Sequence, residues 1–128
     1  MIKKKIFIAD DQEDILSLLK DFLTNHNFEV MVLKEPKNIL ALIINFKPDL
    51  ILLDLLMPDL DGYEICEILN KNSATCEIPI IIITGFGNLG DIKKAYSLGA
   101  VGYCVKPFAL DDLLNKITKT INNKEAKL

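Results

Sequence analysis

The sequence predicts an α/β fold, a doubly wound parallel sheet of five strands flanked by five helices. Short apolar segments alternate five times with segments whose apolar residues recur every three or four positions. The chain has 128 residues, of which 50% are hydrophobic and 26% charged, so it can bury one core but is too short for two ordinary domains. No linker, repeat or low-complexity segment divides it, and we expect a single domain over residues 1–128.

Five short segments are expected to be strands because each is mostly apolar and is bounded by polar or turn-forming residues. These are residues 6–9, 28–33, 50–53, 79–83 and 101–105. The fourth gives the clearest signal, since four isoleucines follow Pro79 and end at Thr84. Continuous apolar runs of this kind are typical of strands covered on both faces. Periodicity does not fix the strand order, but 2-1-3-4-5 is a common order in doubly wound sheets.

Helices are expected between and after these strands, where apolar residues repeat with the helical period. They are expected at residues 15–23, 36–48, 61–69, 91–98 and 110–121. Pro36 can open the second helix and Pro48 can close it, whereas Asp61 is a suitable N-cap for the third. Gly99 can end the fourth in the left-handed conformation, and the polar tail after Asn122 is expected to fray.

Composition and charge narrow the range of partners. The net charge of −3 argues against nucleic acid as a direct partner, because binding phosphates needs a basic surface. No apolar stretch is long enough for a membrane span, and the N-terminus lacks the apolar core of a signal peptide. Cys66, Cys76 and Cys104 are odd in number and fit no metal-binding spacing, which predicts reduced thiols in a cytoplasmic protein.

Polar side chains stand at the ends of four of the five expected strands. Asp10 and Asp11 follow the first strand, Asp54 the third, Thr84 the fourth and Lys106 the fifth. All strands of a parallel sheet end at the same edge, and in the order 2-1-3-4-5 the first and third are neighbours at the switch point, where such folds bind ligands. We therefore expect three carboxylates, a hydroxyl and an ammonium to converge there.

This convergence predicts a site for phosphoryl transfer. Three clustered carboxylates repel one another and need a cation, and a set of oxygen ligands without thiolate or imidazole suits Mg2+. Lys106 and Thr84 can stabilise a transferring phosphoryl group, and Asp54 can act as nucleophile and form an acyl phosphate. A single Asp at a strand end is usually a turn residue or a helix cap. The hypothesis therefore depends on the whole group and not on any one residue.

At these positions the sequence resembles the receiver domain of two-component response regulators, over residues 4–121. The matching motifs are Ala-Asp-Asp at 9–11, Leu-Asp-Leu-Leu-Met-Pro-Asp-Leu-Asp-Gly at 53–62, Ile-Thr-Gly at 83–85 and Tyr-Cys-Val-Lys-Pro-Phe at 103–108. The resemblance implies a flavodoxin-like fold and a phosphoacceptor, Asp54, that is loaded from the phosphohistidine of a sensor histidine kinase or phosphotransfer protein.

The resemblance also implies a role for each residue of the site. The implied Mg2+ ligands are Asp10, Asp11, Asp54 and the backbone carbonyl of Leu56. Thr84 would donate a hydrogen bond to a phosphoryl oxygen, and Lys106 would pair with the phosphoryl group. A cis Lys106-Pro107 bond would direct the Lys106 ammonium toward Asp54. Such a domain is a regulatory phosphoacceptor and not a turnover enzyme, although phosphorylation from small donors and self-dephosphorylation are expected.

The switch that the family uses is implied at Thr84 and Tyr103. On phosphorylation the hydroxyl moves toward the phosphoryl group and the aromatic ring turns inward. The face formed by the fourth helix, fifth strand and fifth helix then changes shape toward an unknown output partner. The protein would be a monomer or a weak, phosphorylation-dependent dimer. Leu56 and Phe86 flank the path of the hydrolytic water, and because both are apolar we expect slow self-dephosphorylation.

Three other functions are less consistent with these residues. A haloacid dehalogenase-type hydrolase needs a second Asp two residues after its nucleophile, where this chain has Leu56. A flavodoxin needs a phosphate-binding loop after its first strand, where Asp10 and Asp11 would repel phosphate. A receiver-like module that binds without phosphorylation would not need the acidic residues, Thr84 and Lys106 together. The chain ends about seven residues past the last expected helix, as a stand-alone receiver or a piece of a longer regulator.

Overall fold

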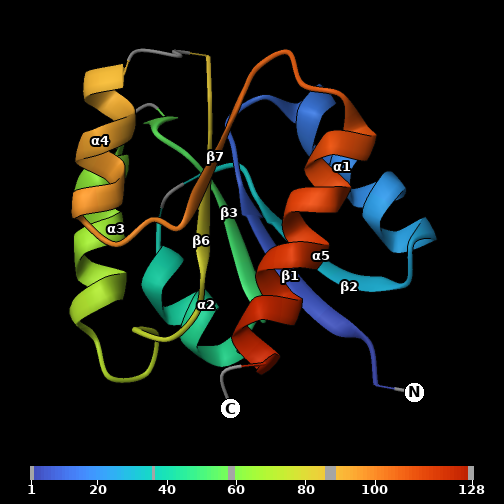
Figure 1. Cartoon of the computed structure of the whole chain (residues 1–128), viewed down its shortest axis with the longest axis horizontal. Helices are drawn as coiled ribbons and strands as arrows, with labels where there is room; N and C mark the ends of the chain where they lie inside the picture. Colours follow the sequence, from blue (N-terminus) through green and yellow to red (C-terminus); the bar gives the residue numbers. More distant parts are fainter. Residues whose placement is uncertain (1, 36, 58–59, 86–88, 127–128) are drawn as a thin grey trace.

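The computed structural model describes residues 2–35, 37–57, 60–85 and 89–126, and its centre is a five-stranded parallel sheet (Figure 1). The strands are β1 (Lys4–Ala9), β2 (Phe28–Leu33), β3 (Leu50–Asp54), β6 (Ile80–Thr84) and β7 (Gly102–Val105). Their order is β2-β1-β3-β6-β7, which confirms the predicted order 2-1-3-4-5. β1 and β3 are therefore neighbours, and the carboxyl ends of both lie at the switch point of the sheet.

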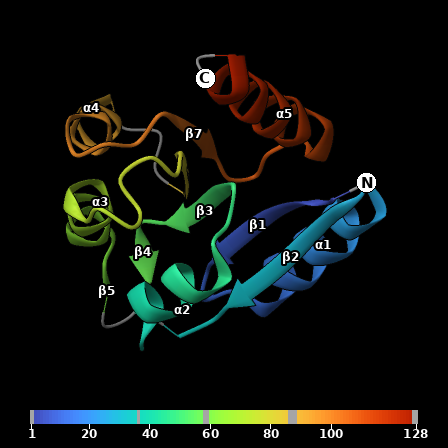
Figure 2. The same ribbon diagram turned by 90° about the horizontal axis from the view of Figure 1, so that it is seen from below.

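Five helices cover the two faces of this sheet. They are α1 (Glu13–Asn25), α2 (Ile39–Phe46), α3 (Gly62–Lys71), α4 (Leu89–Ser97) and α5 (Leu110–Ala126). The helices α1 and α5 pack on one face, and α2, α3 and α4 pack on the other. Figures 1 and 2 show α3 and α4 on one side of the molecule and α1 and α5 on the other. In the part of the chain that the structure describes, no helix is long and apolar enough to cross a membrane.

The central strands are apolar at nearly every position because both faces of the sheet are buried. Successive strand residues point to opposite faces, so Ile6 and Ile8 join the core under α1 and α5, whereas Phe7 and Ala9 join the core under α2, α3 and α4. All four side chains are fully buried. The two cores hold the sheet rigid, and this positions the residues that follow each strand.

Two expected helix ends are confirmed by their local geometry. The Asp61 carboxylate caps α3, since it accepts hydrogen bonds from the backbone N–H groups of Tyr63 (3.0 Å) and Glu64 (3.3 Å). Gly99, just after α4, has φ of +115°, and a Cβ there would come within 2.7 Å of the Asn70 side chain. Glycine is therefore required at this position both by its conformation and by the space around it.

Helix α2 is shorter than the segment between its flanking prolines. It is bounded by Asn38 and Lys47, which both adopt left-handed conformations with φ of 63° and 56°. Asn38 therefore sets the start of the helix, and Lys47 ends it one residue before Pro48. Pro36, which was expected to open the helix, lies outside the described residues.

The predicted fraying after Asn122 is wrong, because α5 continues to Ala126. Ile121 is buried against the core under α1 and α5, and Glu125 in the last turn forms an ion pair with Lys4 of β1. The end of the helix is thus tied to the first strand by a contact between opposite ends of the sequence. Local polarity could not reveal that contact.

A small hairpin that the sequence did not predict follows β3. Its strands are β4 (Leu56–Met57) and β5 (Leu60–Asp61), which pair antiparallel. It ends at Gly62, where an added Cβ would lie 2.6 Å from the Leu55 Cα, so the start of α3 packs directly on the backbone after Asp54. The hairpin and this close approach fix the path of the chain as it leaves the site.

Candidate functional site

Three carboxylates meet at the carboxyl edge of the sheet. Asp10 and Asp11 follow β1, and Asp54 is the last residue of β3. One carboxylate oxygen from each lies within 4.8 Å of the others. Asp10 and Asp54 are buried, whereas Asp11 is partly exposed. The pairing of β1 with β3 therefore brings together residues that are more than forty positions apart in the sequence.

The same local turn orients the two buried carboxylates. Asp10 Oδ1 accepts a hydrogen bond from the Gln12 backbone N–H at 2.9 Å, and Asp54 Oδ1 accepts one from the Leu56 backbone N–H at 3.0 Å. A side chain that bonds the N–H two residues ahead is an Asx turn, which is the ordinary reason for Asp at a strand end. In both cases the turn uses Oδ1 and leaves Oδ2 to face the site.

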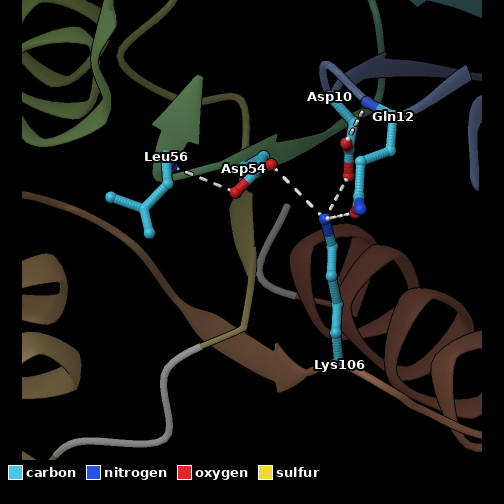
Figure 3. A network of polar contacts seen from close by, with 5 residues as sticks. All are labelled: Asp10, Gln12, Asp54, Leu56 and Lys106. Carbon is cyan, nitrogen blue, oxygen red and sulfur yellow. Dashed lines mark hydrogen bonds and ion pairs between the residues drawn. The ribbon is translucent and has the colours of Figure 1, made fainter. Parts of the chain in front are cut away.

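Lys106 brings a positive charge to these two free oxygens. Its Nζ lies 2.8 Å from Asp10 Oδ2, 2.8 Å from Gln12 Oε1 and 3.4 Å from Asp54 Oδ2 (Figure 3). The Lys106 side chain is only 16% exposed, so its charge is held inside the site. The preceding strand β7 positions it, and the Lys106-Pro107 bond is cis as expected. The ammonium lies nearer to Asp10 and Gln12 than to Asp54.

The surroundings of Asp54 oppose its ionisation on balance. Burial raises the pKa of the Asp54 carboxyl above its ordinary value, and the negative charge of Asp10 raises it further. The hydrogen bond from Leu56 N–H and the Lys106 ammonium act in the opposite direction. A site whose carboxylate is costly to ionise gains stability from any added cation.

The residues present fit a hard divalent cation. Asp10 Oδ2 is buried and accepts no hydrogen bond from any residue that the structure describes. The Lys106 ammonium lies 2.8 Å from it but outside hydrogen-bonding alignment. A buried carboxylate oxygen in this condition is costly unless a positive charge satisfies it. The three carboxylates offer oxygen ligands and no sulfur or imidazole, which is the donor set that Mg2+ prefers.

Thr84 and Tyr103 lie on the neighbouring strands β6 and β7, and β6 also pairs with β3, which carries Asp54. Thr84 ends β6 and is buried, whereas Tyr103 on β7 is partly exposed. The Tyr103 ring stands edge-on to Tyr96 of α4, with centroids 6.2 Å apart, and Lys116 Nζ of α5 lies 5.3 Å from its centroid. Both α4 and α5 thus contact the ring that was expected to switch.

A cavity of only about 10 Å³ lies between Thr84 and Tyr103, and Ala95 of α4 is also part of its wall. A volume of this size holds at most one water molecule. An aromatic ring could enter the space only if Thr84 and α4 moved. The inward movement expected for Tyr103 therefore has to be coupled to a shift of these neighbours.

Leu56 stands at the mouth of the site, in an open cleft of about 670 Å³ that reaches Asp54. The leucine side chain is 53% exposed, which is unusual for a large apolar residue and leaves it beside the approach to the carboxylate. The apolar walls of the cleft also include Leu18 of α1 and Phe108. Phe86, the other residue expected to control water, lies outside the described residues.

Gln12 is a member of the site that the sequence reasoning missed. It directly follows Asp10 and Asp11, and its side chain bonds Lys106 across 94 positions of the sequence. A long polar side chain beside two acidic residues was the available signal. The three cysteines take no part in the site: all are free, and burial raises the pKa of the Cys66 thiol to about 11.

Comparison with known proteins reveals similar sequences. Residues 6–118 match the family described as the response regulator receiver domain. The chain is 36% identical over 123 residues to "Probable transcriptional regulator ycf27" of Cyanophora paradoxa, a match that covers 96% of this chain and 50% of the relative. It is 31% identical over 113 residues to "DNA-binding dual master transcriptional regulator RpaA" of Synechocystis, a match that covers 88% of this chain and 47% of the relative. The chain thus spans about half the length of these relatives.

Solved structures include a close match in fold. The receiver domain of a CheY-like response regulator from Methanospirillum hungatei has a TM-score of 0.92 and 31% sequence identity with this chain. The match covers 99% of this chain and all of the other one. The likeness therefore extends over the whole sheet and both helical layers.

Proposed function

Because the chain belongs to the response regulator receiver domain family, whose members are phosphoacceptors in two-component signalling, we propose that Asp54 accepts the phosphoryl group. One observation carries this assignment. Asp54 is a buried carboxylate that shares the Lys106 ammonium with Asp10 and lies at the end of an open cleft. The donor would be the phosphohistidine of a sensor histidine kinase or of a phosphotransfer protein.

The chemistry is a displacement at phosphorus by the Asp54 carboxylate. A carboxylate oxygen forms a bond to phosphorus while the P–N bond to the donor histidine breaks, and the electron pair stays on the ring nitrogen. The ring leaves as neutral imidazole when its other nitrogen carries a proton. The Asx turn with Leu56 holds the Asp54 carboxylate in one orientation during this approach. This positioning lowers the barrier because little freedom remains to be lost.

Mg2+ would be held by Asp10, Asp11, Asp54 and the backbone carbonyl of Leu56, and it would supply positive charge to the transferring phosphoryl oxygens. Asp10 contributes the buried oxygen that accepts no hydrogen bond. Lys106 contributes a second positive charge, since its Nζ lies 2.8 Å from Asp10 Oδ2 and 3.4 Å from Asp54 Oδ2. Thr84, at the end of the neighbouring strand, would donate its hydroxyl to a phosphoryl oxygen.

The output of the switch would be a change in the face formed by α4, β7 and α5. Thr84 and Tyr103 would relay it, since α4 and α5 both contact the Tyr103 ring. Tyr96 on α4 is 44% exposed and offers an apolar contact for an output partner or for a weak, phosphorylation-dependent dimer. The net charge of −3 argues against direct nucleic acid binding by this domain, although one relative is named as DNA-binding.

The domain would act as a cytoplasmic regulatory module and not as a turnover enzyme. Its expected reactions are phosphorylation from small donors and slow loss of the phosphoryl group. Leu56 supports slow loss because an apolar side chain at the mouth of the site can neither orient nor deprotonate a water molecule. If self-dephosphorylation is slow, a separate phosphatase or the kinase itself would end the signal. The output partner would determine the response.

Labelling by acetyl phosphate or by a phosphorylated histidine donor, with and without Mg2+, tests this function. We expect stoichiometric, Mg2+-dependent labelling of the wild type and none of the Asp54→Ala variant. Asp21→Asn is a matched control, because Asp21 is exposed on α1 and outside the site. Acid-stable, stoichiometric labelling of Asp54→Ala would refute the assignment.

A further inference from the structure

Gln12 stands at the start of α1, yet its side chain does not cap the helix. It is the N-cap residue, with φ of −90° and ψ of 107°, and makes no side-chain hydrogen bond to the helix. Its backbone N–H donates to Asp10 Oδ1 at 2.9 Å, and its carbonyl accepts from the Leu16 N–H at 3.1 Å. Ser, Thr, Asp and Asn are preferred at this position because their short side chains reach the first turn. Helix formation therefore does not explain the glutamine side chain.

The side chain of Gln12 is instead directed at Lys106. Its Oε1 lies 2.8 Å from Lys106 Nζ, as close as Asp10 Oδ2 and closer than Asp54 Oδ2 at 3.4 Å (Figure 3). An ammonium has three N–H donors, and three side-chain oxygens surround this one: two come from the turn between β1 and α1, and the third comes from Asp54 at the end of β3. Gln12 is the uncharged member of the set.

We infer that Gln12 is a positioning residue for Lys106: its amide oxygen holds the ammonium at the mouth of the site, within reach of a phosphoryl group on Asp54. This inference rests on the proposed function of Asp54. A positioning role is distinct from a catalytic one, since Gln12 would act on the phosphoryl group only through Lys106.

The neutral charge of Gln12 matters for this role. A cation bound by Asp10 and Asp54 competes with Lys106 for their oxygens and repels its ammonium. The Gln12 amide oxygen is not part of that competition, so it can retain Lys106 when the carboxylates no longer do. A carboxylate at position 12 would add a fourth negative charge and would hold Lys106 away from the phosphoryl group by a stronger bond.

The effect of removing this acceptor can be bounded. Hydrogen bonds to charged groups are the stronger class, and losing one at a partly exposed site changes a rate by about five- to twentyfold. We therefore expect Gln12→Met, which has similar length but lacks the acceptor, to slow labelling by acetyl phosphate at saturating Mg2+ by about tenfold.

Gln12→Asn separates positioning from helix formation. Asparagine is a better N-cap than glutamine but is shorter by one methylene, so it can stabilise α1 while failing to reach Lys106. We expect its melting temperature to be equal to or above that of the wild type and its labelling rate to fall like that of Gln12→Met. Wild-type labelling by Gln12→Asn would overturn the inference.

A double-mutant cycle tests whether Gln12 acts through Lys106. The proteins are the wild type, Gln12→Met, Lys106→Met and the double variant. Gln12→Met should slow labelling by about tenfold when Lys106 is present and by less than about twofold in the Lys106→Met background, where the ammonium is absent. An equal factor in both backgrounds, or no effect in the wild type, would overturn the inference.

A measurement without phosphoryl transfer completes the test. In protein labelled with 13C-lysine, the Lys106 ε-methylene signal, assigned from its absence in Lys106→Met, reports the mobility of the ammonium. We expect greater mobility in Gln12→Met and no change in the control Glu13→Gln, since Glu13 pairs with Lys34 at 2.7 Å. Unchanged mobility in Gln12→Met contradicts the inference. A wild type that cannot be labelled at Asp54 would instead contradict the proposed function.

Discussion

Replacing Asp54 by asparagine should stabilise the metal-free domain while abolishing its function. The substitution keeps the shape of the side chain and removes its charge. Asparagine also keeps an oxygen that can accept the Leu56 N–H bond now made by Asp54 Oδ1. The change in stability therefore reports mainly on the electrostatics of the site.

The expected gain follows from the distances. The three oxygens lie no more than 4.8 Å apart, and two unit charges at that distance interact by about 3.5 kcal/mol at an effective dielectric constant of about 20. Before screening, Asp10 and Asp11 together therefore oppose the Asp54 charge by about 7 kcal/mol. The attraction between Asp54 and the Lys106 ammonium, at 3.4 Å, offsets about 5 kcal/mol of this repulsion. Because Asp11 is partly exposed, solvent weakens its repulsion of Asp54. Burial of Asp54 has the opposite effect, since desolvation adds to the cost of ionising it. We expect Asp54→Asn to gain about 2 kcal/mol.

The gain should depend on pH in a defined direction. Burial raises the pKa of Asp54 above the ordinary value of 3.8, so the folded protein binds this proton more tightly than the unfolded chain. Folding stability from this group is therefore present below pH 3.8 and is lost as the pH rises through the raised pKa. The Asp54→Asn variant does not lose this stability. Its free energy of unfolding should therefore exceed that of the wild type by an amount that grows from about pH 4 upward and then levels off.

Thermal unfolding in EDTA, followed by circular dichroism at several pH values, measures this effect. A gain of about 2 kcal/mol corresponds to a rise of roughly 6–10 °C in the melting temperature for a chain of this size. Added Mg2+ at about ten times its Kd should raise the free energy of unfolding of the wild type by about 1.4 kcal/mol. The difference in stability between Asp54→Asn and the wild type should then become smaller. Asp21→Asn is the exposed control. An Asp54→Asn protein that melts at or below the wild-type temperature in EDTA at pH 7.5 would refute the reasoning.

Three further substitutions have defined outcomes. Asp11→Ala should suppress both Mg2+ binding, measured by calorimetry, and Mg2+-dependent labelling; normal labelling without divalent cations would exclude the metal role. Leu56→Asn should speed phosphate release from the labelled protein, and a wild type that decays equally fast would show that Leu56 does not limit water. Gly62→Ala should lower stability by about 1–3 kcal/mol in urea unfolding, because its Cβ would lie 2.6 Å from the Leu55 Cα; an unchanged midpoint would mean that the backbone yields freely.

The arrangement of the sheet could be predicted because its signals are local or follow from general rules of topology. A strand such as Ile80–Thr84 is apolar at nearly every position since both faces are covered, and that pattern is visible in the sequence. Parallel strands end at one edge, so Asp10 and Asp54 could be placed together once the order of β1 and β3 was assumed. The order itself came from precedent, and the structure confirms it.

Other features depend on contacts between distant segments. The two-residue strands Leu56–Met57 and Leu60–Asp61 are too short to show any period. Gln12 and Lys106 meet only because α1 and the chain after β7 converge above the sheet. The end of α5 depends on the pair between Lys4 and Glu125. Each of these contacts is created by the fold; a local pattern could mark Gln12 as a polar neighbour of Asp10 and Asp11 but could not identify Lys106 as its partner.

The charges of the site explain why a residue as costly as Asp54 can stand at the end of an apolar strand. When all three carboxylates are ionised, three negative charges and the Lys106 ammonium leave a net charge of −2. A divalent cation would bring that sum to zero, and conversion of the carboxylate to an acyl phosphate dianion would then return it to −1. The proposed signal would therefore be one unit of charge, placed where the walls are apolar and screening is weak. The Lys106 ammonium faces this charge, and Gln12 tethers it without altering the sum. The two large cores on either side of β3 supply stability that offsets the electrostatic repulsion among the carboxylates.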